Sequence, residues 1–235
     1  MQHAAVTLAA NRQRPYRVAA YTPILFFLRD HAVTVTANPA LSLAELAQGY
    51  FSRKDRYPEL NLTAGWFAVQ LKAGECLVLL DGLDEVADGE KRRALSQWVD
   101  QQIKAYPRCR FVITSRPEGY KSAPLERANV VEVQNFDWEK VKRFVKGWYL
   151  AEEAASVGTS PDFTKAGVQQ RADRDAADLL RRLSDNRSAT LQDLTVNTLL
   201  MTMIAMVHRH RGVLPGKRIK LYKEMCEVLL ERLWE

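Results

Sequence analysis

Short apolar runs without polar alternation occur at residues 24–28, 76–80 and 111–113. A strand with this pattern is covered on both faces, as in the interior of a parallel sheet between helices. A valine-rich run at residues 130–133 predicts a last strand. Stretches with helical signals separate the first three runs, and this alternation is typical of an α/β fold with a parallel sheet.

The intervening stretches carry recognisable helix boundaries. Ser42 and Glu45 form a capping box, in which each side chain satisfies an unpaired backbone amide of the first turn. Gly74 can adopt the left-handed conformation that ends a helix and turns the chain into the next strand. Asp137 is a candidate N-cap. Helices are therefore expected at residues 1–14, 42–51, 63–73, 90–106 and 137–149.

The pattern changes after residue 150. Gly, Ser and Pro fall together at residues 158–161, which predicts a linker or an excursion within residues 151–167. Helical patterns follow at residues 179–183, 199–211 and 219–234. The sequence thus predicts an α/β domain over residues 1–150 and a helical subdomain over residues 151–235.

Composition is compatible with this architecture and narrows the classes of partner. The chain has 235 residues, is 47% hydrophobic and carries 34 Lys and Arg against 28 Asp and Glu, a net charge of +6. That charge favours polyanions weakly. The basic residues are scattered over separate predicted helices without interleaved aromatics, so no specific nucleic acid is inferred as a partner.

The cysteines and the apolar runs indicate the compartment. The 3 cysteines are far apart and form no CxxC pair, which argues against a disulfide framework or a zinc site and for the reducing cytoplasm. No signal peptide is recognised, and the longest apolar run is short and interrupted by polar residues, so no membrane partner is expected. His208 and His210 are interpreted as charge near a helix end.

Candidate chemistry follows the strand at residues 76–80. Asp81, Asp84 and Glu85 come directly after it, where an open parallel sheet holds its ligands. Repulsion among three close acids is tolerable if a cation lies between them, and Mg²⁺ takes carboxylate oxygens while phosphates fill its other positions. The pattern therefore predicts phosphate chemistry. The alternative is that the acids form a turn that caps the helix starting near Glu90.

Aspartyl-phosphate phosphatases are a second class that places an Asp at the end of an apolar strand. Their second Asp follows two positions on, where this chain has Leu83. The whole stretch, LLDGLDE at residues 79–85, instead resembles the Walker B strand of P-loop NTPases, in the form found in the NACHT family of signalling ATPases. The resemblance implies that Asp81 helps hold Mg²⁺, that Asp84 or Glu85 acts on water, and that the nucleotide is ATP or another NTP.

Three further segments are similar to the same family. Residues 23–30, PILFFLRD, are one, and residues 114–117, TSRP, look like its sensor strand, so Arg116 would sense the γ-phosphate. The alternative for Arg116 is a simple pair with an acid on the rim. The third segment, residues 194–235, is similar to the helical part of the family, with Thr198 where the family typically has a proline that contacts adenine. Thr198 is thus a candidate cofactor-binding position, and its identity puts adenine recognition by this segment in question.

One expected motif is missing. The sequence contains no GxxxxGK followed by Ser or Thr, so it has no recognisable phosphate loop and is expected to be incomplete as an NTPase. We favour the greater part of a NACHT-type nucleotide switch, whose first strand and phosphate loop lie outside the sequence shown. A degenerate, non-catalytic interaction module and an unrelated hydrolase are the alternatives. Coding sequence upstream of Met1 would separate the first two.

The favoured interpretation carries expectations about structure and partners. The sheet should have a gap between residues 111–114 and 130–133, where the family's phosphate-loop strand lies. By resemblance, the partners are a nucleotide, other domains of a larger signalling or defence protein, and copies of the protein itself on activation.

Overall fold

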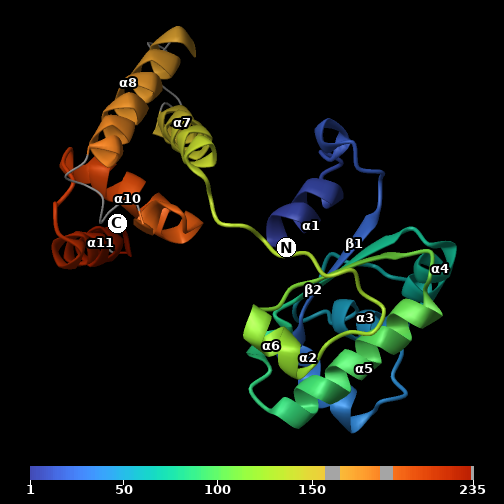
Figure 1. Cartoon of the computed structure of the whole chain (residues 1–235). Helices are drawn as coiled ribbons and strands as arrows, with labels where there is room; N and C mark the ends of the chain where they lie inside the picture. The colour runs from blue at the N-terminus through green and yellow to red at the C-terminus, as the bar shows by residue number, and fades with distance from the viewer. Residues whose placement is uncertain (157–164, 186–192, 234–235) are drawn as a thin grey trace. The chain divides into compact units, whose positions relative to one another are not determined.

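The computed structural model describes residues 1–156, 165–185 and 193–233, and its chain forms two compact units, Met1–Val130 and Val131–Glu235 (Figure 1). The first unit is a parallel sheet with flanking helices, and the second consists of helices. The predicted α/β class, with helices following the sheet, is therefore confirmed.

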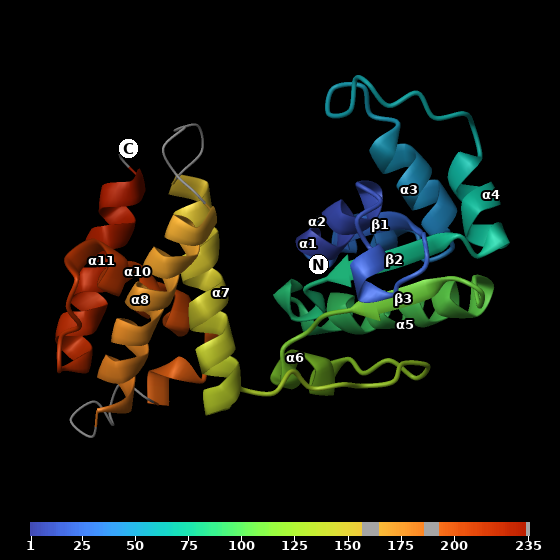
Figure 2. The same ribbon diagram turned by 90° about the horizontal axis from the view of Figure 1, so that it is seen from above.

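The sheet has three parallel strands in the order β1-β2-β3, which lie side by side in Figure 2. They are β1 Thr22–Phe27, β2 Cys76–Asp81 and β3 Arg110–Ile113. Strand β2 lies in the middle, with Leu80 level with Phe26 on one side and Ile113 on the other. Because both edges of β2 are paired and both of its faces are covered, an uninterrupted apolar run is stable there.

The hydrophobic core of the first unit lies mainly on one face of this sheet. Ile24 and Phe26 of β1, with Val78 and Leu80 of β2, occupy alternate positions and belong to the core. The opposite face is less covered, since Val112 of β3 is 44% exposed. The edge strand β3 has a neighbour on one side only among the strands of the described chain.

The expected strand at residues 130–133 does not form, and that prediction was wrong. This segment has no regular structure, and Val131 is 87% exposed. β-Branched residues favour a strand only when a neighbouring strand and a covered face are available. Because one of the two flanking strands is absent from the described chain, the expected gap between residues 111–114 and 130–133 stays a prediction.

Helices surround the sheet and mostly begin where the sequence predicted. Ser42 caps its helix through a complete capping box with Glu45, as expected. Asp88 caps the crossover helix by accepting from the backbone N–H groups of Glu90 and Lys91. These hydrogen bonds hold the pKa of Asp88 below its usual range. The helices are α1 Gln2–Ala9, α2 Leu28–Ala37, α3 Leu43–Phe51, α4 Trp66–Ala73, α5 Gly89–Ala105 and α6 Pro117–Ser122, with 3-10 turns η1 Arg14–Tyr16 and η2 Leu83–Glu85.

Three of these helices differ from the expectation, and one of them, α6, was not predicted at all. Helix α1 ends at Ala9 rather than at Arg14, because Asn11 adopts a positive φ of 53° that a right-handed helix does not allow. Helix α2 was not predicted, since its sequence is rich in β-branched residues with low helix propensity. Its buried residues, among them Leu28, Ala32 and Val35, pack into the core, so tertiary packing outweighs propensity there.

The second unit is a group of packed helices around its own core. Its helices with described bounds are α7 Trp138–Ser156, α8 Lys165–Ser184, α10 Thr198–Arg211 and α11 Arg218–Leu233. The fully buried Tyr149, Leu179, Ile204 and Leu221 come from one helix each. Asp137 accepts from the backbone N–H of Lys140 at 2.8 Å, as predicted for an N-cap.

The linker was placed too broadly. Helix α7 continues to Ser156 and α8 begins at Lys165, so residues expected to be irregular are helical at both ends; residues 158–161 lie outside the described chain. Helix α7 also belongs to the second unit, which begins at Val131. The two units reflect packing contacts only. The boundary expected at residue 150, between the α/β domain and the helical subdomain, therefore stays a prediction.

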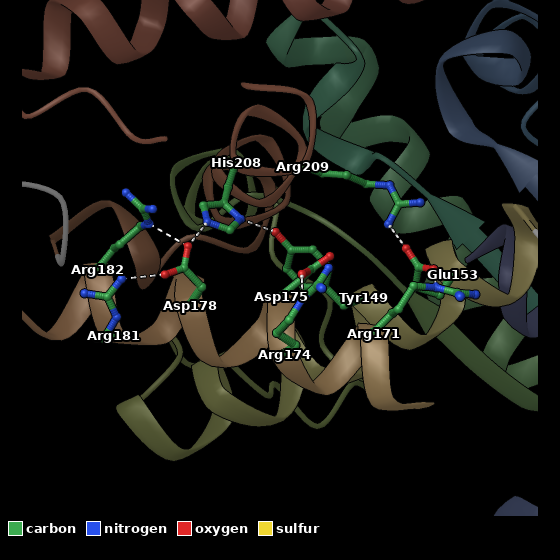
Figure 3. Close-up of polar contacts among 10 residues, drawn as sticks. All are labelled: Tyr149, Glu153, Arg171, Arg174, Asp175, Asp178, Arg181, Arg182, His208 and Arg209. Carbon is green, nitrogen blue, oxygen red and sulfur yellow. Dashed lines mark hydrogen bonds and ion pairs between the residues drawn. The ribbon is translucent and has the colours of Figure 1, made fainter. Parts of the chain in front are cut away.

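His208 lies in the last turn of α10, near a helix end as interpreted from the sequence, but its burial was not expected. It is 5% exposed in the second unit and bridges Tyr149 and Asp178 (Figure 3). In the described part of the chain, no helix is long and apolar enough to cross a membrane. The cysteines are unpaired: Cys76 and Cys109 are buried, and Cys226 is exposed.

Candidate functional site

Strands β2 and β3 end at the same edge of the sheet, and Thr114 joins the two ends. The Thr114 hydroxyl donates to Oδ1 of Asp81 and accepts from the backbone N–H of Gly82 at 3.0 Å. The backbone of Thr114 continues the pairing, with its N–H on the Leu80 carbonyl at 3.0 Å and its carbonyl on the Leu83 N–H at 2.9 Å. The carboxylate of Asp81 is therefore held in one orientation by the neighbouring strand.

The chain turns sharply after Asp81 because of Gly82. Gly82 has a φ of 77°, and a Cβ at this position would lie 2.9 Å from Cδ of Glu85. Only glycine fits this conformation without strain. The 3-10 turn that follows buries Leu83 completely, which anchors the acidic turn to the core and leaves Asp84 and Glu85 at its surface.

Asp84 points toward the turn between β3 and α6. Its Oδ1 accepts from the backbone N–H of Arg116 at 3.0 Å, and its Oδ2 lies 3.5 Å from Nε of Arg116. The Asp84 side chain is 15% exposed, whereas that of Arg116 is 88% exposed. The alternative considered for Arg116, a pair with an acid on the rim, thus describes its contact in this structure, and most of its guanidinium remains open to solvent.

Glu85 has a different partner. Its Oε2 lies 2.9 Å from Nη1 of Arg29, 56 positions away in the sequence at the start of α2, and the Glu85 side chain is 46% exposed. Sequence reasoning assigned no role to Arg29 or Thr114. Both follow directly on an apolar run, as Asp81 does, and polar residues at the ends of such runs were the signal that could have identified them.

The three acids do not gather around one point. Each has its own partner, Thr114 for Asp81, Arg116 for Asp84 and Arg29 for Glu85, and these contacts relieve the repulsion that suggested a cation between them. No group of three His, Cys, Asp or Glu side chains in the described ranges lies close enough to hold a metal. The acids are not helix caps either, because Asp88 caps α5.

Asp81 by itself still suits a hard cation. Its carboxylate receives one hydrogen bond, from Thr114, so oxygen lone pairs remain for a ligand. Mg²⁺ is commonly bound by one or two carboxylates together with phosphate oxygens and water. The donor set at the end of β2 therefore fits Mg²⁺ that arrives with a phosphate group.

Thr198 belongs to the second unit and is the first residue of α10, where it is exposed. Asn197 caps this helix by accepting from the N–H groups of Leu199 and Leu200 at 2.9 Å and 3.2 Å. A hollow of about 330 Å³ in the same unit does not include Thr198. It is lined by Phe136, Trp138, Val141, Ser184, Thr195 and Val196.

The middle strand of this parallel sheet thus ends in a carboxylate, and the neighbouring strand end carries a hydroxyl and an arginine, at the edge where open α/β sheets bind ligands. In agreement, the family model of the NACHT domain matches residues 1–152. The chain belongs to the NACHT family, whose domain is an NTPase module of signalling proteins. Searches of curated proteins and of solved structures gave no match.

Proposed function

We propose that this chain is the nucleotide-binding module of a NACHT-type signalling or defence ATPase, a switch between ATP-bound and ADP-bound forms in the cytoplasm. The observation that carries the proposal is the Asp81 carboxylate, fixed by Thr114 at the carboxyl end of the central strand. The family match supports nucleotide binding, and the arrangement of Asp81, Glu85 and Arg116 supports the assignment of roles.

Each side chain has a role that its position allows. Asp81 would hold Mg²⁺, which when bound neutralises charge on the phosphates. The exposed carboxylate of Glu85 would orient the attacking water or take its proton, once it separates from Arg29. The exposed fork of Arg116 would donate to the γ-phosphate oxygens, a geometry that suits a guanidinium.

The phosphate loop must come from elsewhere in this proposal. The 235-residue chain has no GxxxxGK segment, so it lacks the clustered amides and the lysine that cradle the β- and γ-phosphates. We therefore expect the chain by itself to show no micromolar binding of ATP with Mg²⁺ in a calorimetric titration. Micromolar binding would mean that other residues cradle the phosphates.

The decisive experiment uses a version with a strand and a phosphate loop placed ahead of residue 1. This version should bind ATP with Mg²⁺ and hydrolyse it. Asp81→Ala should abolish metal-dependent binding, whereas Glu85→Gln should preserve binding and slow hydrolysis by about a hundredfold, the usual scale of a lost general base. Equal hydrolysis by the unmodified protein and both variants would disprove the assignment of roles.

The second candidate is a non-catalytic NACHT-like interaction module. The structure offers a specific observation in its favour, since all three acids already have protein partners and do not form a common cation site. If the version with a phosphate loop neither binds nor hydrolyses ATP while it folds normally, this second candidate is the better account.

A further inference from the structure

The acidic turn and helix α6 meet at one point, the side chain of Asp84. The backbone N–H of Arg116, the N-cap residue of α6, donates to Asp84 Oδ1 at 3.0 Å. One turn further on, Gly119 lies directly against the same side chain. A Cβ added at Gly119 would overlap Cβ of Asp84 and lie 3.0 Å from its Cα.

This close approach exists only because residue 119 has no side chain. Other glycines in helices are different: around Gly147 in α7, nothing lies within 4 Å of an added Cβ. Glycine is also unfavourable in a helix, since alanine has the higher helix propensity. The close contact between α6 and Asp84 gives a physical reason for glycine at this position.

The contacts leave Asp84 poorly placed to act on water. Its two oxygens face the backbone N–H and Nε of Arg116, and the side chain is 15% exposed. The neighbouring Glu85 is more open, at 46%. The hydrogen bond from the Arg116 N–H ties the residue that precedes α6 to the turn that carries Asp84.

We propose that Asp84 is a positioning residue that holds the turn between β3 and α6, and thereby the backbone of Arg116, with Gly119 providing the space for it. The acid that acts on water is then Glu85. The assignment of Glu85 rests on the proposed function. The positioning role of Asp84 does not, so the two can be tested separately.

The positioning role of Asp84 is tested on the 235-residue chain by amide hydrogen exchange over residues 114–122. Asp84→Ala removes the acceptor of the Arg116 N–H, so exchange there should rise about fivefold or more, as expected for a lost hydrogen bond. Asp84→Asn keeps an acceptor oxygen and should restore most of the protection. Equal exchange in the unmodified chain and in Asp84→Ala would disprove the positioning role of Asp84.

A pair of glycine substitutions tests the close packing. Gly147→Ala should leave exchange over residues 114–122 unchanged and raise the melting temperature or leave it unchanged, since alanine favours the helix. Gly119→Ala should speed exchange over residues 114–122 and lower the melting temperature. Equal exchange over residues 114–122 and equal melting temperatures in the two variants would contradict the close packing of Gly119 against Asp84.

The assignment of Glu85 is tested by hydrolysis in the version that carries a phosphate loop. Asp84→Asn should keep hydrolysis within a few-fold of the unmodified protein, while Glu85→Gln lowers it far more. A loss with Asp84→Asn as large as with Glu85→Gln, at unchanged exchange over residues 114–122, would make Asp84 the acid that acts on water. Failure of every version to hydrolyse ATP would refute the proposed function and leave the exchange result standing.

Discussion

The hydroxyl of Tyr149 lies 2.6 Å from Nδ1 of His208, and Nε2 of the same ring lies 3.0 Å from Oδ2 of Asp178 (Figure 3). The three residues come from α7, α10 and α8, so this chain of contacts joins three helices of the second unit. Burial raises the pKa of Tyr149, which keeps its hydroxyl protonated. Each nitrogen of the buried His208 ring thus meets one polar group, and the two groups come from different helices.

Removal of this hydroxyl should destabilise the helical unit. Tyr149→Phe leaves Nδ1 of the buried His208 without its partner, and an unsatisfied buried polar group costs about 1 to 3 kcal/mol. We expect a loss of that size in the free energy of unfolding measured with urea. Tyr222→Phe is the control, because Tyr222 is exposed and should change stability by less than about 0.5 kcal/mol. Equal effects would contradict the structural role of the contact.

The same region predicts a loss of stability in acid. A hydrogen bond from Arg182, with others from Arg181 and His208, holds the pKa of Asp178 well below its usual range despite burial. Burial alone would raise the pKa of Glu153, but hydrogen bonds from Arg171 and Arg209 outweigh it and lower the pKa.

A folded-state pKa below the unfolded value means that the unfolded chain takes up protons first. The contribution of both acids is therefore present above their unfolded values of about 4, and it is lost as pH falls below them. Unfolding free energies measured between pH 6 and pH 3 should decrease, and Asp178→Asn should weaken this dependence while lowering stability at pH 7. A free energy that stays constant over this range would refute the prediction.

The hydroxyl of Thr114 should matter for both stability and the metal. Thr114→Val keeps the shape but leaves the Gly82 N–H and the Asp81 carboxylate without their partner. We expect a loss of about 1 to 2 kcal/mol in unfolding free energy. In the version with a phosphate loop, binding of ATP with Mg²⁺ should weaken as well. Thr114→Ser retains the hydroxyl and should restore both properties, and failure of the serine variant to do so would point to the lost methyl group instead.

We predict that molecules of this chain associate. Val130, Val131 and Val133 are exposed, and one edge of β3 pairs with no strand of the described chain. An unpaired strand edge can pair with another chain, and an exposed β-branched segment can supply a strand to such an edge. Sedimentation of the 235-residue chain should therefore show association that increases with concentration, and Val131→Lys together with Val133→Lys should reduce it. Val69→Lys, on the exposed side of α4, is the matched control and should not. A monomer at every concentration would contradict this prediction.

Sequence patterns were sufficient where local chemistry determines the structure. The strand at residues 76–80 was predictable because five consecutive apolar residues require cover on both faces, and the structure places β2 in the middle of the sheet. Ser42 and Glu45 were predictable because both partners of a capping box lie within one turn. The acids after Leu80 were recognisable as candidates for the same reason, since their position relative to a strand end is local.

Tertiary structure decided which groups these acids meet. Arg29, Thr114 and Arg116 lie far from the acidic turn in sequence, and only the parallel register of β1, β2 and β3 brings their strand ends to one edge. Residues 130–133 have the composition of a strand, but a strand forms only beside a neighbour, which composition cannot supply. The burial of His208 was not predicted for a similar reason: the helices packed around a histidine decide whether it is exposed or buried, and those contacts arise only on folding.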